Sequence, residues 1–281
     1  MLTPFTELLA GSARGSAVGA FTCYDLESAV AALGAASAAG AGVILLIGGR
    51  SYAEPGGDLL LAALLAAAGR AEARACVQLD HSHELAQIEA AVKAGAGAVM
   101  ADGSALAYEQ NIELVSRAVE IARAHGAAVE AELGGIRGDE DVAQAVSAGA
   151  LTDPVQAAGF MRRTGAACLA VSIGNVHGIY RDPPVLDWER LDAIRSLVAA
   201  PLSLHGASGI PDAMVRRAIM AGVAKINVNT ELRQAYLAAT EETIGAVLAG
   251  SRLNALHAAQ VAAVEAVIAT KLTAFGVRAT A

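Results

Sequence analysis

Val77-Gln78-Leu79-Asp80-His81 is a strand-compatible run that ends on a carboxylate and an imidazole. A buried strand that stops at such a pair places two reactive side chains at the rim of a core. Neighbouring side chains of a strand point to opposite faces, so the following turn must redirect one of them if both serve one site. Taken alone, the segment is better explained by a solvated aspartate and a capping histidine. The functional interpretation depends on whether similar strand ends recur.

Apolar runs recur through all 281 residues and alternate with helix-like segments. Most are continuous rather than alternating, which is typical of a parallel sheet buried on both faces. Their starts are roughly 20 to 40 residues apart, enough for one helix between successive strands. We predict one α/β domain over residues 1–281, a (β/α)8 TIM barrel with additional C-terminal helices, with a doubly wound open sheet as the alternative. The predicted strands are 17–24, 42–47, 75–80, 97–102, 127–133, 166–173, 201–205 and 223–228.

The helix-like segments between these strands have recognisable capping residues. Asp153-Pro154 and Pro211-Asp212 are typical of helix starts. Gly69, Gly95 and Gly222 are placed to follow the last helical residues. The predicted helices are 58–68, 89–93, 155–164, 213–221 and a long helical region over 230–273.

Composition limits the classes of function. A net charge of -8 and a pI near 5.3 argue against a nucleic-acid or membrane-surface binder. The three cysteines are far apart in apolar runs, which indicates buried thiols in a reducing compartment. The uncharged stretch 28–49 has the length of a membrane span, but it is better explained as a helix, a glycine-rich turn and a buried strand. Residues 1–11 lack the pattern of a signal peptide, so we expect a soluble cytoplasmic protein.

Chemistry-bearing residues follow the predicted strands. In a TIM barrel the reacting groups gather at the C-terminal ends of the strands. His81, His177 and His205 would therefore lie on one rim, where three imidazoles suit Zn²⁺ and leave a coordination position open. Each histidine alone is more simply explained by a hydrogen bond to a backbone carbonyl. The carboxylates on the same rim favour the metal site: Asp80, Asp102, Glu130 and Glu132.

Other histidines and loops are weaker candidates. His83 competes as a ligand but falls in the turn after the strand, and His125 and His257 fall in helical segments. The glycine-rich ends of the last three strands suit a phosphate, because backbone N–H groups can approach it closely. Ordinary barrel turns that need glycine are the alternative. The acidic loop 134–141 is a solvated surface loop by default and a candidate lid or general base over the site.

These strand ends resemble class II, zinc-dependent ketose-bisphosphate aldolases, and the likeness to the fructose- and tagatose-bisphosphate enzymes is strongest. The resemblance extends over about residues 19–236 and keeps the order of the motifs. The segments that carry it are Leu79-Asp80-His81, Val99-Met100-Ala101-Asp102-Gly103-Ser104, Val129-Glu130-Ala131-Glu132-Leu133-Gly134, Val176-His177-Gly178-Ile179-Tyr180, Leu204-His205-Gly206-Ala207-Ser208-Gly209 and Lys225-Ile226-Asn227-Val228-Asn229-Thr230.

The resemblance implies a metal-dependent lyase that reversibly splits a ketose 1,6-bisphosphate into dihydroxyacetone phosphate and an aldehyde phosphate. His81, His177 and His205 match the zinc ligands, and Asp102 and Glu132 match carboxylates at alternative metal positions. Asp80 matches the acid/base at the C4 hydroxyl, and Glu140 matches the acid of the mobile loop. The residues that match the binding segments for dihydroxyacetone phosphate are Gly178, Gly206, Ala207, Ser208, Asn227, Val228, Asn229 and Thr230.

The implied reaction suits these groups. Breaking the C3–C4 bond leaves an enediolate, which Zn²⁺ stabilises as a Lewis acid. Asp80 would take the C4 hydroxyl proton and Glu140 would protonate the enediolate. A second metal position and a monovalent cation are compatible with the resemblance, which also favours a homodimer or homotetramer.

Four positions depart from the usual pattern and leave the substrate open. Thr22 stands where Asn is usual, Gly48 where Ser is frequent, Ser82 where Gly is frequent, and Ala207 replaces the second glycine of the Gly-Gly-Ser-Gly turn. Two other readings therefore stay open. One is a class II aldolase-like lyase on another phosphorylated sugar or sugar acid, and the other is a non-catalytic subunit that binds a sugar phosphate.

Overall fold

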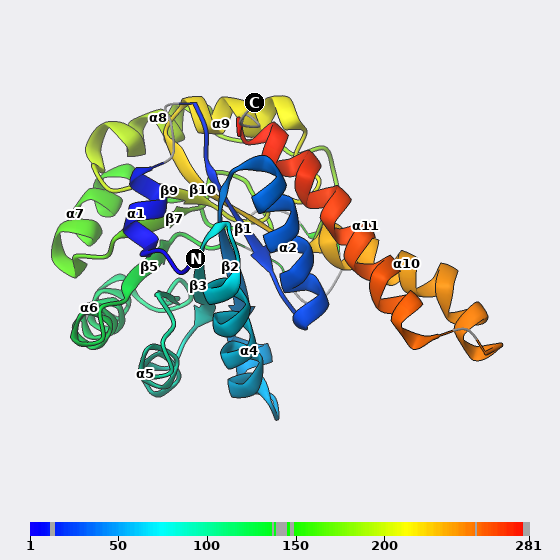
Figure 1. Cartoon of the computed structure of the whole chain (residues 1–281). Helices are drawn as coiled ribbons and strands as arrows, with labels where there is room; N and C mark the ends of the chain where they lie inside the picture. Colours follow the sequence, from blue (N-terminus) through cyan, green and yellow to red (C-terminus); the bar gives the residue numbers. More distant parts are fainter. Residues whose placement is uncertain (12–14, 137, 139–144, 147–148, 251, 278–281) are drawn as a thin grey trace.

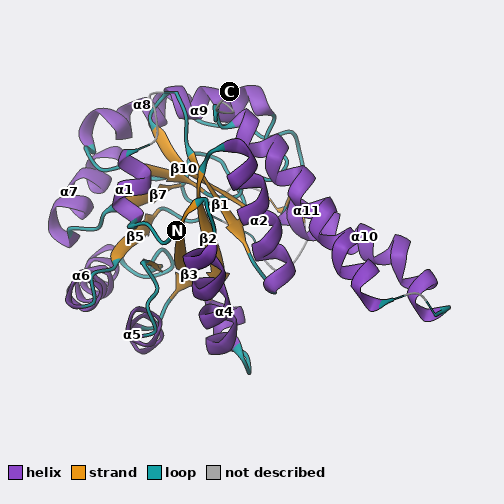
Figure 2. Ribbon diagram, viewed as in Figure 1, coloured by secondary structure: helices purple, strands orange, loops and turns teal. Residues whose placement is uncertain are grey.

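The barrel is closed by eight parallel strands, as predicted, and the open-sheet alternative is excluded. The structure, a computed structural model, describes residues 1–11, 15–136, 138, 145–146, 149–250 and 252–277. Around the barrel the strands follow the order β1-β10-β9-β7-β5-β4-β3-β2, with helices outside and strands inside (Figures 1 and 2). The strands of the barrel are β1 (Val18–Thr22), β2 (Gly42–Gly48), β3 (Arg74–Ser82), β4 (Ala98–Ala101), β5 (Ala128–Leu133), β7 (Cys168–Val171), β9 (Leu202–Leu204) and β10 (Val223–Val228).

The helices follow the strands in alternation. They are α1 (Phe5–Ala10), α2 (Leu26–Ala39), α3 (Gly49–Ala53), α4 (Gly57–Arg70), α5 (Leu85–Lys93), α6 (Tyr108–Ala124), α7 (Pro154–Thr164), α8 (Trp188–Leu197), α9 (Asp212–Met220), α10 (Thr230–Leu248) and α11 (Leu253–Ala274). Outside the barrel, β6 (Ala145–Val146) pairs with β8 (Ile179–Tyr180). The sequence did not predict this short pair.

Local chemistry explains the element ends. Asp25 caps α2 by accepting a hydrogen bond from the Ser28 amide at 2.8 Å, which ends β1 earlier than predicted. Asp153 caps α7 in the same way. Gly222 follows α9 in the left-handed region with φ 105°, as predicted. The prediction for Gly69 was wrong, because α4 continues to Arg70 and Gly69 lies within its last turn.

The barrel interior changes character along its length. At the N-terminal end of the strands, α1 closes the barrel with Phe5 and Leu8, which pack on Ile44, Cys76 and neighbouring inward residues. Alternate residues of a strand share one face, so the face of β3 that carries Cys76 also carries Gln78 and Asp80. The interior is thus apolar where α1 closes it and polar toward the opposite end, where the predicted site lies.

All three thiols are free and buried, as predicted. Burial raises the pKa of Cys23 and of Cys76 to about 12 in each case, and it raises the pKa of Cys168 well above its usual range. These cysteines are packing residues that stay as neutral thiols.

The predicted helical region at the C-terminal end forms two helices, α10 and α11, which project from the barrel as a pair (Figure 1). By length and apolar composition alone, α11 resembles a membrane span. However, it packs against α2 and α10, and Val264, Ile268 and Leu272 on it are buried. Stretch 28–49 is likewise a helix, a turn and the barrel strand β2.

Candidate metal and substrate site

A left-handed backbone at His81 brings both members of the Asp80-His81 pair into one site. His81 has φ 47°, the one described non-glycine residue with positive φ, and the pairing register of β3 with β4 shifts between Leu79 and Ser82. A bulge of this kind re-aims a side chain. The alternation of the strand alone would have turned His81 away from Asp80, so the redirection that the sequence required is present.

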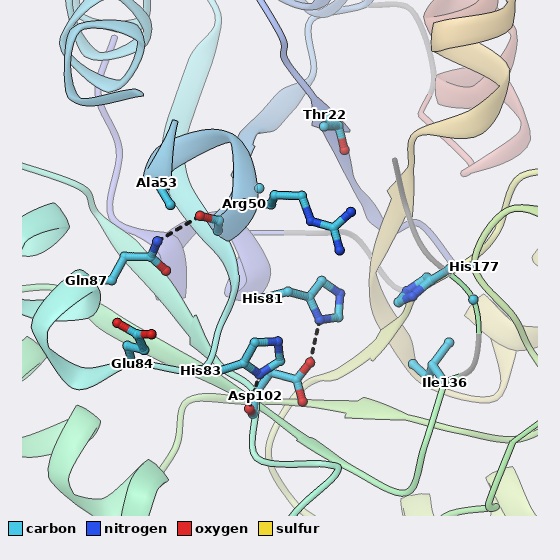
Figure 3. A pocket seen from close by; sticks show the side chains of 13 residues that line it. Thr22, Arg50, Ala53, His81, His83, Glu84, Gln87, Asp102, Ile136 and His177 are labelled. Carbon is cyan, nitrogen blue, oxygen red and sulfur yellow. Dashed lines mark hydrogen bonds and ion pairs between the residues drawn. The ribbon is translucent and has the colours of Figure 1, made fainter. Parts of the chain in front are cut away.

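The three predicted histidines converge from β3, the loop after β7 and the end of β9. The ring centroid of His81 lies 5.0 Å from that of His177 and 5.0 Å from that of His205. The centroids of His177 and His205 are 5.9 Å apart. One nitrogen of each ring lies within 4.8 Å of the others, which is a spacing that can hold a metal ion. Figure 3 shows His81 and His177 facing the same cavity.

Two carboxylates fix the orientation of the rings. Asp102 Oδ2 lies 2.8 Å from His81 Nδ1, and Glu130 Oε1 lies 2.8 Å from His205 Nε2. Burial raises the pKa of Asp102, but its hydrogen bond and charge interaction with His81 outweigh this effect and hold that pKa below its usual range. A carboxylate behind the imidazole is the usual second partner of a metal-binding histidine.

The imidazole nitrogens that face one another are suited to binding a cation. His81 Nε2 and His205 Nδ1 are 3.0 Å apart. When both rings are neutral and donate to their carboxylates, each of these atoms presents a lone pair, and a divalent metal between them and His177 would stabilise the arrangement. The donor set, three imidazoles with ordered second partners, therefore fits the predicted metal.

Behind the histidines lies a buried network that the sequence did not predict. Glu130 Oε2 is 2.7 Å from Lys225 Nζ and accepts a hydrogen bond from Gln78 Nε2 at 2.7 Å. Lys225, Glu130 and Gln78 are each 0% exposed. Burial alone would lower the pKa of Lys225, but Glu130 and Asp80 raise it above its usual value. Lys225 is therefore a buried cation, paired with the carboxylate that orients His205.

The same network reaches Asp80. Lys225 Nζ donates to Asn227 Oδ1 at 2.6 Å, and Asn227 Nδ2 donates to Asp80 Oδ2 at 3.1 Å. Asp80 is 1% exposed. The predicted acid/base group is thus oriented by Asn227, a residue that the resemblance placed among the substrate-binding residues.

Glu132 is also part of the rim. It lies with His81 and Asp102 in a second arrangement that can hold a metal. Burial, followed by the neighbouring charge of Asp102, raises the pKa of Glu132 to about 8. Among the described residues its Oε2 has no hydrogen-bond partner. This geometry keeps Asp102 and Glu132 as candidates for an alternative metal position.

Two cavities lie near the histidines. The outer cavity, of about 460 Å³, contains His81, His177, Asp102, Thr22 and Arg50 in its wall. The second cavity, of about 390 Å³, begins at the residue after His177. Its wall contains three of the predicted substrate-binding residues, together with Tyr180 and Arg181: Gly178, Ser208 and Thr230.

The remaining predicted substrate-binding residues lie outside the wall of the second cavity and have structural contacts. At Gly206, with φ 61°, an added Cβ would lie 2.0 Å from the Val176 carbonyl oxygen, so only glycine fits this turn. Ala207 and Val228 are buried in the core, and Asn229 accepts a hydrogen bond from the Tyr24 hydroxyl at 3.0 Å.

The other predicted candidates have different places. Glu140 lies outside the described residues. His83 Nδ1 bonds to the Asp102 carbonyl at 2.7 Å, His125 ends α6, and His257 pairs with Glu27 at 3.0 Å. Sequence reasoning missed Lys225 and Arg50. A lysine within the apolar run 223–228 was a usable signal, because a buried ammonium needs a carboxylate partner.

The sequence matches a family described as class-II fructose-bisphosphate aldolase over residues 5–279. The crystal structure of the YdjI aldolase from Escherichia coli K12 is 31% identical with a TM-score of 0.86, and the alignment covers 99% of this chain and 98% of that one. A putative fructose-1,6-bisphosphate aldolase from Coccidioides immitis is 30% identical with a TM-score of 0.89, over 97% of this chain and 96% of that one.

A fructose-bisphosphate aldolase from Campylobacter jejuni, 18% identical with a TM-score of 0.80 over 99% and 97% of the two chains, shares the fold. The family match covers nearly the whole chain, and the three histidines converge as a metal-dependent reaction requires. The chain therefore belongs to the class II fructose-bisphosphate aldolase family, soluble metal-dependent carbon–carbon lyases that bind phosphorylated sugars.

Proposed function

We propose that the protein is a zinc-dependent aldolase that reversibly cleaves a ketose 1,6-bisphosphate of the fructose or tagatose type. The products are dihydroxyacetone phosphate and an aldehyde phosphate. The observation that carries this proposal is the convergence of the three histidines at the outer cavity, with the buried carboxylate of Asp80 beside them and the second cavity beginning at the residue after His177. A substrate with its reacting carbons at the histidines can place one end in each cavity.

The proposed roles follow from the contacts. His81, His177 and His205 would hold the zinc ion, which supplies Lewis acidity at the ketone end of the substrate when bound. Asp80, oriented by Asn227, takes the proton of the C4 hydroxyl as the C3–C4 bond breaks. Glu140 is proposed, from the family resemblance, to return a proton to the ketone-derived carbon.

The second cavity is proposed to hold dihydroxyacetone phosphate. Gly178, Ser208 and Thr230 offer backbone amides and hydroxyls there, and Arg181 offers a positive charge. Asp102 and Glu132 are proposed as an alternative metal position. A cytoplasmic location and a homodimer or homotetramer remain proposals from the family resemblance.

Metal analysis and a coupled cleavage assay test the proposal together. We expect zinc bound to the purified protein, cleavage of fructose or tagatose 1,6-bisphosphate, loss of activity on chelation and recovery when Zn²⁺ is returned. A protein that binds zinc and ketose phosphates without turning any of them over would instead be the non-catalytic subunit. Turnover restricted to another phosphorylated sugar or sugar acid would keep the aldolase mechanism and correct the substrate.

A further inference from the structure

The outer cavity contains one permanent positive charge among the described residues of its wall. This charge is the guanidinium of Arg50, which lies in the cavity between Thr22 and His81 (Figure 3). The charge of Asp102 in the same wall is paired with His81 at 2.8 Å. Because the whole chain carries a net charge of -8, an anionic group has no general attraction to the protein and needs such a local cation.

Hydrogen bonds from Ser82 and Gln87 hold the start of α3, the short helix that contains Arg50. Gly49, the preceding residue, accepts a hydrogen bond from Gln87 Nε2 at 2.7 Å through its carbonyl. Gln87 in turn accepts one from the Ser82 hydroxyl at 2.6 Å. An added Cβ at Gly49 would lie 2.5 Å from the His81 carbonyl oxygen, so the turn also needs glycine to approach β3. Ser82, one of the departures from the family pattern, therefore helps to position the backbone at Gly49, next to Arg50.

A second donor lies in the wall of the same cavity. Thr22 is 5% exposed, and among the described residues its Oγ1 has no hydrogen-bond partner. A buried hydroxyl without a partner is costly, and a ligand oxygen beside it would remove that cost. A hydroxyl and a guanidinium in one wall offer hydrogen bonds to an oxyanion, and the planar guanidinium can bind a phosphate or a carboxylate through two parallel bonds.

We propose that Arg50, together with Thr22, binds the anionic group at the end of the aldehyde-derived half of the substrate. The group is a terminal oxyanion, either phosphate or carboxylate, and it would lie in the outer cavity. This inference rests on the proposed aldolase function and identifies the residue that selects the aldehyde. The contact chain from Ser82 through Gln87 to Gly49 positions that residue.

The synthesis direction separates the two halves of the substrate. Zinc-loaded protein is assayed at saturating dihydroxyacetone phosphate with three aldehydes of similar length: glyceraldehyde 3-phosphate, succinic semialdehyde and neutral glyceraldehyde. The wild type should prefer at least one anionic aldehyde over glyceraldehyde. A preference for the phosphate identifies a phosphorylated aldehyde as the partner, and a preference for the carboxylate identifies an acid; either result supports the inference.

Substitution of Arg50 should act on the anionic aldehyde alone. In Arg50→Gln we expect the KM for the preferred anionic aldehyde to rise roughly ten- to a hundredfold, the loss expected for a hydrogen-bonded charge pair. The kcat/KM for glyceraldehyde should stay within about threefold of wild type. Arg50→Lys keeps the charge without the planar fork and should recover part of the loss. Arg117→Gln, on the exposed surface of α6, is the matched control.

The positioning contacts have their own test. Gln87→Leu removes the hydrogen bond to the Gly49 carbonyl and the one from the Ser82 hydroxyl. It should raise the KM for the anionic aldehyde several-fold, less than Arg50→Gln does, while turnover of glyceraldehyde is kept.

Two results would overturn the inference in distinguishable ways. Equal kcat/KM for anionic and neutral aldehydes in the wild type, or equal losses for both in Arg50→Gln, would remove the anion site and leave the aldolase standing. No turnover of any aldehyde by the zinc-loaded wild type would remove the aldolase function, and the anion site with it.

Discussion

The inner and outer parts of the site are built in different ways. The inner part consists of strand residues, including Asp80, Glu130 and Lys225, whose side chains bond to one another across the barrel and are almost fully buried. The outer part consists of Arg50, Thr22 and His83, which follow strands or end them and face an open cavity. The groups proposed to bind the metal and to move protons are thus held in place by contacts within the barrel. The groups proposed to contact the aldehyde end of the substrate can be substituted without disturbing these contacts within the barrel.

The largest effect that would test this comparison is expected for His205→Ala. The variant removes a proposed zinc ligand and leaves Glu130 with Lys225 and Gln78 as its remaining partners. We expect zinc to be lost from the purified protein and cleavage to fall below detection. Metal analysis with circular dichroism checks both metal content and folding. A folded variant that keeps zinc at wild-type stoichiometry would contradict the proposed ligand set.

Asp80→Asn separates proton transfer from metal binding. Asparagine keeps the shape of the side chain but cannot accept the C4 hydroxyl proton. Because general acid–base groups contribute roughly 10²- to 10⁴-fold, we expect kcat to fall by about that factor while zinc content stays at one ion per chain. The coupled cleavage assay and metal analysis measure both. Wild-type turnover in this variant would move the acid/base role to another residue.

Lys225→Met tests the buried network. Removing one member of a buried ion pair leaves the other charge uncompensated, which costs about 3–5 kcal/mol of unfolding free energy. Urea unfolding of the zinc-free protein measures this cost. The double variant Lys225→Met/Glu130→Gln should recover much of the loss, because no lone charge remains.

The matched control for this network is Lys93→Met. It removes a lysine whose pair with Glu89 is half exposed, and it should leave the unfolding free energy at the wild-type value within error. If Lys225→Met behaved like this surface control, the inner part of the site would not depend on the network.

The smallest effect is expected for a glycine on the outer side. Gly48→Ser has room, since the nearest atom to an added Cβ is Ser51 Oγ at 3.9 Å, and its unfolding free energy should stay within about 0.5 kcal/mol of wild type. Gly206→Ala, in the turn behind His205, should cost at least about 2 kcal/mol through backbone strain and collision with Val176. Similar costs for the two variants would erase the difference between the inner and outer parts.

The barrel could be predicted from the sequence because the patterns that mark its strands and helices are local. Continuous apolar runs such as 42–47 and 223–228 mark strands buried on both faces, and helix caps such as Asp153 mark what lies between them. Histidines at strand ends then share a rim because all strands of such a barrel run in the same direction. The metal-site hypothesis needed only that shared direction.

Contacts between strands that are distant along the chain could not be predicted from the sequence. Lys225 meets Glu130 across 95 positions of the chain, and no local pattern states that their side chains enter the barrel at the same level. The bulge that redirects His81 is needed for Asp80 and His81 to share one site, but no residue pattern in the sequence marks it. Arg50 was missed for a different reason: a charged residue after a strand is usually solvated, and the sequence alone does not show that this one lies in the wall of the outer cavity.

The buried thiols described for the core also make the protein a convenient background for site-specific labelling. Only the thiolate reacts readily with alkylating reagents, and burial raises the pKa of all three native cysteines. A single cysteine introduced on the exposed surface should therefore be modified alone, without first deleting the native ones. A fluorophore placed in this way on α3, beside Arg50, would report directly on whether an anion reaches the outer cavity.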